Sequence, residues 1–300
     1  MKEAYKKFYK KLRFNLSANN NSVYIGFYKY FYSPSKGSVS AFLDEFSKLH
    51  HTVHVVQIGA NDGITHDPIH KFIKRDQWNG VLLEPQKHVF PTLEKLYAKN
   101  KGIKTLNAAL GNSDGKTKLY KIGFSNSRWA TGLATFNREV LEEAFENGYV
   151  EKWARIDNTS IPAHKEEQII AEEIQVTSTD TLLKSNNLNQ VDFLQIDTEG
   201  FDFEVIKLFL GNTLGIKPTG IIYEHFHLSN EDIFRSNYRD AFDLSYHESI
   251  RKLIHKMNSQ SRFSIEEQME LRVDDTNITL LVNIQVLAGV SKKYRGTFFS

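Results

Sequence analysis

The sequence predicts an α/β fold built on a doubly wound, mostly parallel sheet. From residue 53 onward, short runs rich in Val, Ile and Leu alternate with segments of helical periodicity, and this alternation is typical of βαβ units. The first two runs, Val53–Ile58 and Val81–Glu84, are largely apolar, as strands are when helices cover both faces of a sheet. The first run ends in a glycine turn and the second in a carboxylate, so we expect a ligand site where these strands end.

Length and composition favour one large domain with appendages. The chain has 300 residues, of which 40% are hydrophobic and 25% charged, which is ordinary for a globular protein. Its net charge of +2 is too small to predict a nucleic-acid-binding protein. The absence of cysteine excludes disulfides, thiolate metal sites and cysteine nucleophiles. No signal peptide or membrane-spanning run is recognisable, so we expect a cytoplasmic protein.

We expect three parts along the chain. Residues 1–50 form an N-terminal helical and aromatic extension, residues 51–284 form the main domain, and residues 285–300 form a C-terminal tail. Within the main domain the alternation loosens over residues 122–171. Insertions beside a strand-end pocket often form a lid or an acceptor site.

The N-terminal segment 2–14 is both basic and aromatic. Its apolar residues recur at helical spacing among lysines: Tyr5, Phe8, Tyr9 and Leu12. One interpretation is an interfacial helix that binds anionic lipid, which would place the protein at the inner membrane face. The other is a terminal helix that packs on its own domain or on a second copy in a homo-oligomer.

The glycine turn after the first strand indicates the kind of ligand. Gly59 and Gly63 bracket Ala60, Asn61 and Asp62, so the backbone can bend tightly and approach a ligand. The spacing is G-x-x-x-G, not the G-x-G-x-x-G that binds a dinucleotide pyrophosphate. Glu84 ends the second strand, where a carboxylate can accept hydrogen bonds from both ribose hydroxyls. A carboxylate placed to bind the ribose, without a glycine-rich turn that binds a pyrophosphate, suits S-adenosylmethionine.

Five motifs in order carry a resemblance to a known family. VVQIGANDG, LLEP, TLNAALGNSDG, DFLQIDTEGFD and IIYEHFHLS are similar to motifs of the FkbM family of S-adenosylmethionine-dependent methyltransferases, over Val53 to Val282. The resemblance implies a Rossmann-like methyltransferase fold whose last strand is antiparallel. It also implies an O-methyltransferase that acts on hydroxyls of sugars, glycans or natural products.

One cofactor position departs from the general methyltransferase pattern. Gln57 stands where an acidic residue often holds the methionine end of the cofactor, and its carbonyl can still accept a bond from the ammonium. The turn at Asn107 and Ala108 could support the adenine ring or be a packing turn. The expected cofactor-binding residues are Gln57, Gly59, Ala60, Asn61, Gly63, Glu84, Pro85, Asn107, Ala108 and Asp197.

Candidate catalytic residues follow two later strands. Asp197 comes after the run Val191–Ile196, and Glu224 and His225 come after Gly220–Tyr223. An acceptor hydroxyl needs a base or a metal to lower the cost of losing its proton. His225 could be that base, oriented by Asp197 or Glu224. Alternatively, these two carboxylates and Glu199 could hold Mg²⁺ or a similar hard cation.

The acceptor site is expected beside the cofactor. An aromatic side chain next to an arginine suits the apolar face and the hydroxyls of a sugar, although a surface elaboration would have the same composition. The expected substrate-binding residues are Glu199, Arg128, Trp129, Thr131 and His66.

The sequence therefore predicts an O-methyltransferase with a small-molecule or glycan acceptor. Two alternatives stay open: an oxidoreductase that uses NAD or NADP, and a non-catalytic methyltransferase-like scaffold that binds a partner or a membrane.

Overall fold

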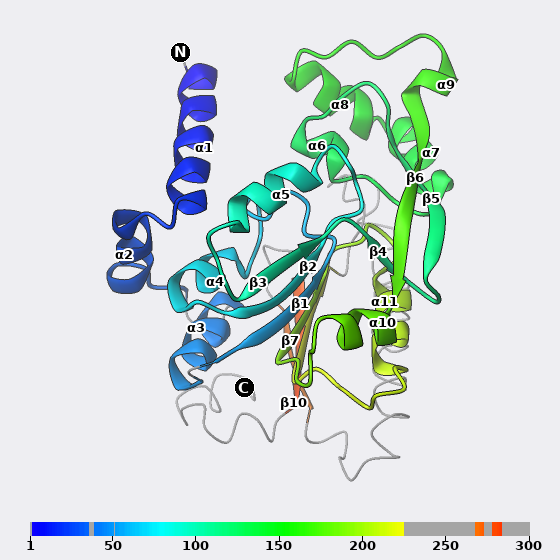
Figure 1. Ribbon diagram of the computed structural model, residues 1–300. Coiled ribbons are helices and arrows are strands. Elements are labelled where there is room, and N and C mark those ends of the chain that lie inside the picture. The colour runs from blue at the N-terminus through cyan, green and yellow to red at the C-terminus, as the bar shows by residue number, and fades with distance from the viewer. Residues whose placement is uncertain (1, 36–38, 51, 225–267, 273–277, 284–300) are drawn as a thin grey trace.

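The computed structural model describes residues 2–35, 39–50, 52–224, 268–272 and 278–283. Three helices precede the first strand, and strands and helices alternate over residues 54–106 and again over residues 169–224 (Figure 1). The elements are α1 (Lys2–Ala18), α2 (Ser22–Tyr30), α3 (Val39–Leu49), β1 (His54–Ile58), α4 (His70–Asp76), β2 (Asn79–Leu83), α5 (Phe90–Tyr97), β3 (Ile103–Leu106), β4 (Ala109–Gly111), β5 (Gly115–Ile122), α6 (Arg128–Thr131), α7 (Arg138–Glu146), α8 (Tyr149–Ile156), α9 (Lys165–Gln168), β6 (Ile169–Ser178), α10 (Thr179–Ser185), β7 (Phe193–Ile196), α11 (Asp202–Leu210), β8 (Gly220–Glu224), β9 (Gln268–Arg272) and β10 (Ile278–Asn283).

The main sheet has seven strands in the order β3-β2-β1-β7-β8-β10-β9. The first five of these are parallel to their neighbours, while β10 runs antiparallel to both β8 and β9. This is the doubly wound, mostly parallel sheet that the sequence predicted, and the antiparallel last strand that the resemblance implied is confirmed. The predicted C-terminal tail, residues 285–300, lies outside the described residues.

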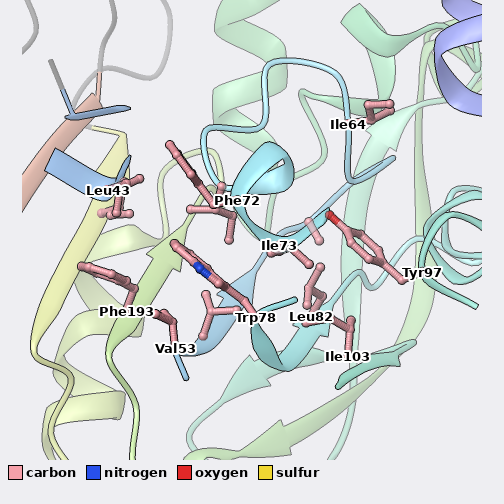
Figure 2. Close-up of a cluster of buried hydrophobic side chains, with 14 of the residues drawn as sticks. Leu43, Val53, Ile64, Phe72, Ile73, Trp78, Leu82, Tyr97, Ile103 and Phe193 are labelled. Carbon is pink, nitrogen blue, oxygen red and sulfur yellow. The ribbon is translucent and has the colours of Figure 1, made fainter. Parts of the chain in front are cut away.

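Helices cover both faces of the sheet, with α3, α4 and α5 on one side and α10 and α11 on the other (Figure 1). Successive strand residues point to opposite faces, so Val55 joins the first core cluster and Val56 the second. In the first cluster, the Trp78 ring stacks 5.7 Å from Phe72 and 5.9 Å from Phe193 (Figure 2). Burial on both faces explains why these strands are apolar at nearly every position.

A second, three-stranded sheet has the order β4-β6-β5. Strands β5 and β6 pair antiparallel, with Ile122 opposite Ile169, so the insertion, residues 123–168, connects the paired ends of these two strands. The insertion contains helices α6 to α9 and has its own small apolar core. The sequence did not predict this separate sheet, because hydrophobic alternation does not specify which strands pair.

The N-terminal helices pack on the main domain. The helix α1 ends at Ala18, and α2 begins after Asn21, whose side chain accepts bonds from the N–H groups of Val23 and Tyr24. Ser17 and Tyr24 reach the buried ring of His70 on α4, with contacts of 3.0 and 3.4 Å. Within the described ranges, no helix has the length and apolarity required to cross a bilayer.

Candidate functional site

A cavity lies at the carboxyl ends of the parallel strands, under the short helix α6. Its empty volume is about 560 Å³, including space open to solvent. Loops after β1, β2 and β7 form its floor, and residues of the insertion cover it. The lining residues are Ile58, Gly59, Asn61, Glu84, Pro85, Gln86, Ala109, Leu110, Leu119, Arg128, Thr131, Gly132, Ala134, Phe136, Asp197, Thr198, Glu199, Phe201 and Val205.

The turn after β1 requires glycine at its first position. Gly59 has a φ of +80°, and a Cβ there would lie 1.8 Å from the backbone oxygen of Asp197. The N–H groups of Gly59 and Ala60 both donate to the carbonyl of Leu83, at 3.0 and 2.8 Å. Because these donors are used within the fold, the turn has no array of free N–H groups for a pyrophosphate. This agrees with the absence of the dinucleotide fingerprint.

Glu84 lines the cavity and is only 2% exposed. Its Oε2 accepts the N–H of Asn61 and its Oε1 the N–H of Gln86, both at 2.8 Å. Burial raises the pKa of Glu84 to about 7, opposed by these two backbone donors. Each carboxylate oxygen retains a further acceptor position, so the carboxylate can still bind hydroxyl groups of a ligand.

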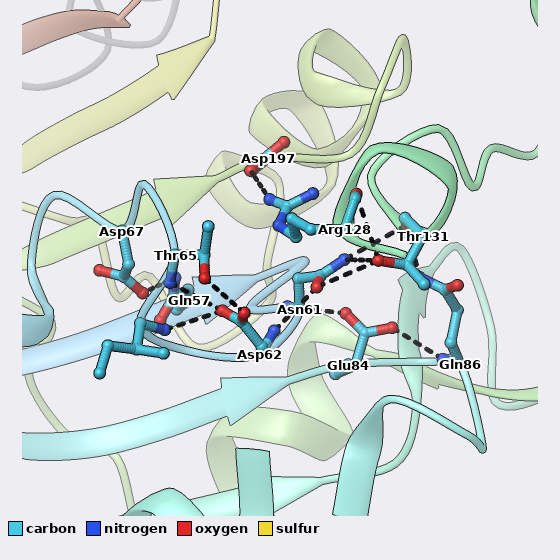
Figure 3. Close-up of polar contacts among 11 residues, drawn as sticks. Gln57, Asn61, Asp62, Thr65, Asp67, Glu84, Gln86, Arg128, Thr131 and Asp197 are labelled. Carbon is cyan, nitrogen blue, oxygen red and sulfur yellow. Dashed lines mark hydrogen bonds and ion pairs between the residues drawn. The ribbon is translucent and has the colours of Figure 1, made fainter. Parts of the chain in front are cut away.

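Two amide side chains hold α6 over the cavity. The carbonyl oxygen of Thr131 accepts bonds from Asn61 Nδ2 at 3.2 Å and Gln86 Nε2 at 2.9 Å. Figure 3 shows Asn61 between Glu84 and Thr131, so the loops after β1 and β2 and the insertion meet at one point. On the same helix, Arg128 Nη2 lies 4.0 Å from Asp197 Oδ2, which joins the insertion to the end of β7.

The structure brings together many of the residues singled out in the sequence. From the cofactor set, the cavity is lined by Gly59, Asn61, Glu84, Pro85 and Asp197. From the acceptor set, it is lined by Arg128, Thr131 and Glu199.

Other expected cofactor residues support the site from outside the lining. Gln57 is buried and donates to Asp67 at 2.9 Å, while its Oε1 has no partner among the described residues. Asn107 donates to the carbonyls of Glu84 and Pro85 and so braces the end of β2. The turn residues Ala60 and Gly63 and the residue Ala108 are likewise absent from the lining.

Two expected acceptor residues also lie away from the cavity wall. Trp129 packs with Phe124 in the core of the insertion, and its ring N–H donates to Asp157 at 3.3 Å. His66 is an exposed turn residue with a φ of +59°. Both were selected because they follow a motif or flank an arginine, and neither criterion determines which way a side chain points.

Two of the candidate catalytic residues, Asp197 and Glu224, lie at the carboxyl ends of neighbouring strands. Ile196 pairs with Tyr223 across β7 and β8, so Asp197 and Glu224, which follow them, leave neighbouring strands side by side. His225 lies outside the described residues. Within the portion of the chain that the structure describes, no three His, Asp or Glu side chains cluster in a way that could hold a metal ion.

Sequence reasoning missed several residues of the wall. Gln86 carries no recognisable signal, since its role depends on a carbonyl 45 residues away. Phe136 of the insertion packs edge-on against Phe201, with ring centroids 4.9 Å apart, and both line the cavity. Phe201 directly follows the DTEG motif, so its position alone could have identified it.

Comparison with known proteins identifies the family. A family model described as the methyltransferase FkbM domain matches residues 57–261, which is well over half of the chain. The protein belongs to the FkbM methyltransferase family. This confirms the resemblance that the five motifs predicted. No curated protein matches the sequence.

Among solved structures, the FkbM methyltransferase of Methylobacillus flagellatus KT is similar to this chain with a TM-score of 0.40 and 12% identity, over 79% of this chain and 47% of that one. This chain therefore spans about half the length of that protein. The SAH-bound methyltransferase PaMTH1 of Podospora anserina has a TM-score of 0.38 and 9% identity, over 91% and 86% of the two chains. The O-methyltransferase of Bacillus cereus in complex with SAH has a TM-score of 0.35 and 13% identity, over 91% and 88%.

The residues of this chain fit the cofactor that its family implies. Glu84 is a buried hydrogen-bond acceptor of the cavity, and Ala109 and Leu110 are apolar residues of the same lining. The unpartnered Oε1 of Gln57 is an acceptor near the same turn. A methyltransferase family also favours this cofactor over the nicotinamide dinucleotide of an oxidoreductase.

Proposed function

We propose that this FkbM methyltransferase transfers a methyl group from S-adenosylmethionine to a hydroxyl of a sugar, a glycan or a related small molecule. The observation that carries the proposal is the cavity at the strand ends, where Glu84 on the floor faces Arg128 and Thr131 of the insertion. One side of this cavity has the chemistry to bind a nucleoside. The other side has polar groups that suit an acceptor.

On the cofactor side, Glu84 would accept the ribose hydroxyls, and Ala109 and Leu110 would pack against the adenine ring. When bound, S-adenosylmethionine supplies an electrophilic methyl carbon on a cationic sulfur. The carboxylate of Asp197 lies at the neighbouring strand end, 4.0 Å from the guanidinium of Arg128.

On the acceptor side, Arg128, Thr131 and Glu199 offer donors and acceptors, and Phe136 offers an apolar surface. This mixture suits a ligand that carries several hydroxyls. The insertion would also exclude water, which increases the contribution of positioning to the rate.

Two mechanisms for removing the proton of the acceptor hydroxyl are proposed as alternatives. In the first, His225 is the general base and Asp197 or Glu224 orients its ring. In the second, Asp197, Glu199 and Glu224 bind a hard divalent cation that lowers the pKa of the acceptor hydroxyl. Support for both comes from the adjacent strand ends, since Ile196 and Tyr223 are in register.

Transfer of a radiolabelled methyl group from S-adenosylmethionine into a panel of sugars, nucleotide sugars and glycan extracts tests the function. We expect label in at least one hydroxyl acceptor, and a complete lack of transfer to the panel together with a failure to bind the cofactor would contradict the proposal. A chelator that abolishes transfer favours the cation. Loss of transfer in His225→Ala, with cofactor binding and the exposed control His164→Ala unchanged, favours the base.

A further inference from the structure

Helices α1 and α2 each present an exposed apolar stripe. On α1 the spacing is i, i+3, i+4 and i+7, and on α2 it is i, i+4, i+7 and i+8, so each stripe occupies one side of its helix. The side chains are between 43% and 77% exposed. These eight residues, here called the aromatic face, are Tyr5, Phe8, Tyr9, Leu12, Val23, Phe27, Tyr30 and Phe31.

The aromatic face is not the surface by which these helices attach to the domain. Among the residues of the two helices whose burial is described, Ser17, Ala18 and Tyr24 are buried. Arg13 donates to the carbonyl of Ile64 at 3.1 Å. Figure 1 shows α1 and α2 together at one edge of the molecule, with α1 extending away from the sheet. The helix α1 therefore packs on its own domain, as one of the two interpretations predicted, but residues outside its apolar stripe make that contact.

Positive charge is concentrated on the same two helices. Residues 2–31 contain seven lysines and arginines and one acidic residue, a net charge of +6. Since the whole chain carries +2, the remaining residues carry a net charge of −4. The charged residues of the segment are Lys2, Glu3, Lys6, Lys7, Lys10, Lys11, Arg13 and Lys29.

We propose that the aromatic face docks on a bilayer surface that contains anionic lipids. Tyrosine and phenylalanine rings bury apolar area at the headgroup boundary, and nearby lysines are attracted to the negative surface potential. A second copy of the chain is a poorer occupant, because symmetric contact through this face would bring two segments of +6 together. The proposal is independent of the proposed reaction.

Co-sedimentation with vesicles tests the proposal, using phosphatidylcholine alone and a three-to-one mixture of phosphatidylcholine and phosphatidylglycerol. We expect the full chain to bind the mixed vesicles only, and high salt to weaken binding. The variant Phe8→Ser/Phe27→Ser/Phe31→Ser should bind at least about tenfold more weakly, since it removes buried apolar area. The variant Lys10→Gln/Lys11→Gln should lose about fivefold per lysine.

The control Ile156→Ser removes a side chain that is 63% exposed but lies on the insertion, and it should bind like the wild type. All the substituted side chains are exposed, so unchanged circular dichroism and melting temperature would verify folding. Equal binding to both vesicle types, or wild-type binding by the triple phenylalanine variant, would overturn the proposal. A wild-type dimer that this variant converts to a monomer would overturn it as well, because a second copy would then cover the aromatic face.

Discussion

The backbone of Gly59 lies against the backbone of Asp197, where the turn after β1 meets the end of β7. The contact is so close that a Cβ on residue 59 would be 1.8 Å from the carbonyl oxygen of Asp197. The absence of a side chain at residue 59 therefore allows the end of β1 to lie close to the end of β7. The strand β7 leads directly into Asp197, the candidate catalytic carboxylate.

Alanine substitutions at Gly59 and at Gly148 should distinguish the cost of a steric clash from the cost of a left-handed backbone conformation. Gly59 and Gly148 have φ values of +80° and +77°, but a Cβ on Gly148 would meet nothing within 4 Å. Gly148→Ala should cost about 1 to 2 kcal/mol of unfolding free energy for the left-handed conformation. Gly59→Ala should cost about 3 kcal/mol more, because β7 must move. Equal losses in urea unfolding would show that the two strand ends can separate at no cost.

Ligand affinity should depend on the protonation of Glu84. Burial raises the pKa of this carboxyl to about 7, and hydroxyl groups donate more strongly to the ionised form. Because the ligand prefers the ionised form, affinity should rise with pH through about 7. We expect adenosine, which has no group that titrates near neutral pH, to bind about tenfold more tightly at pH 8 than at pH 6.

Calorimetry at the two pH values checks this expectation. Glu84→Gln cannot ionise, so its affinity should be low and nearly independent of pH. The nearby Arg128 guanidinium lowers the pKa of Glu84. In Arg128→Ala this effect is lost, so the pH midpoint of the affinity profile should move upward. The surface arginine variant Arg138→Ala should retain the wild-type midpoint. A wild-type profile that matches Glu84→Gln would remove Glu84 from ligand binding.

The sequence predicted what depends on local pattern. The strand ends at Gly59, Glu84 and Asp197 follow from apolar runs that stop at polar or flexible residues, and all three line one cavity. The attachment of α6 was not predictable, because the bond from Gln86 to the carbonyl of Thr131 joins residues without a periodic relationship. For the same reason Trp129, which shares a short helix with Arg128, could not be assigned to the core of the insertion.

Lys74 should be important for stability although it lies far along the chain from the N-terminal helices. Its ammonium is buried and donates to the carbonyl of Leu96 at 2.7 Å and to the side chains of Asn20 and Asn100 at 3.1 and 2.5 Å. Lys74→Met would leave these acceptors unpaired, so we expect a loss of about 2 to 4 kcal/mol in urea unfolding.

The matched control is Lys99→Met, which removes one exposed bond to Asn19 and should change stability by less than about 0.5 kcal/mol. If Lys74→Met unfolds at the wild-type urea concentration, methionine packing must replace the whole network.

Gln86 should keep α6 closed over the cavity. Its side-chain amide is buried and donates to the carbonyl of Thr131, which also accepts from Asn61. Gln86→Leu retains the bulk and removes one of these two donors, which corresponds to about three- to tenfold in a local opening equilibrium. The N–H groups of Thr131 and Gly132 bond within the turn of α6, so their hydrogen exchange should accelerate by that factor.

Gln168→Leu is the appropriate control, because Gln168 makes a comparable bond to the carbonyl of Pro162 within the insertion. Its loss should leave exchange at Thr131 and Gly132 unchanged. Acceleration in both variants would mean that the insertion opens as one unit about its two strands, β5 and β6. Acceleration in Gln86→Leu alone would show that α6 opens separately, and that the bond between Gln86 and Thr131 controls access to the cavity.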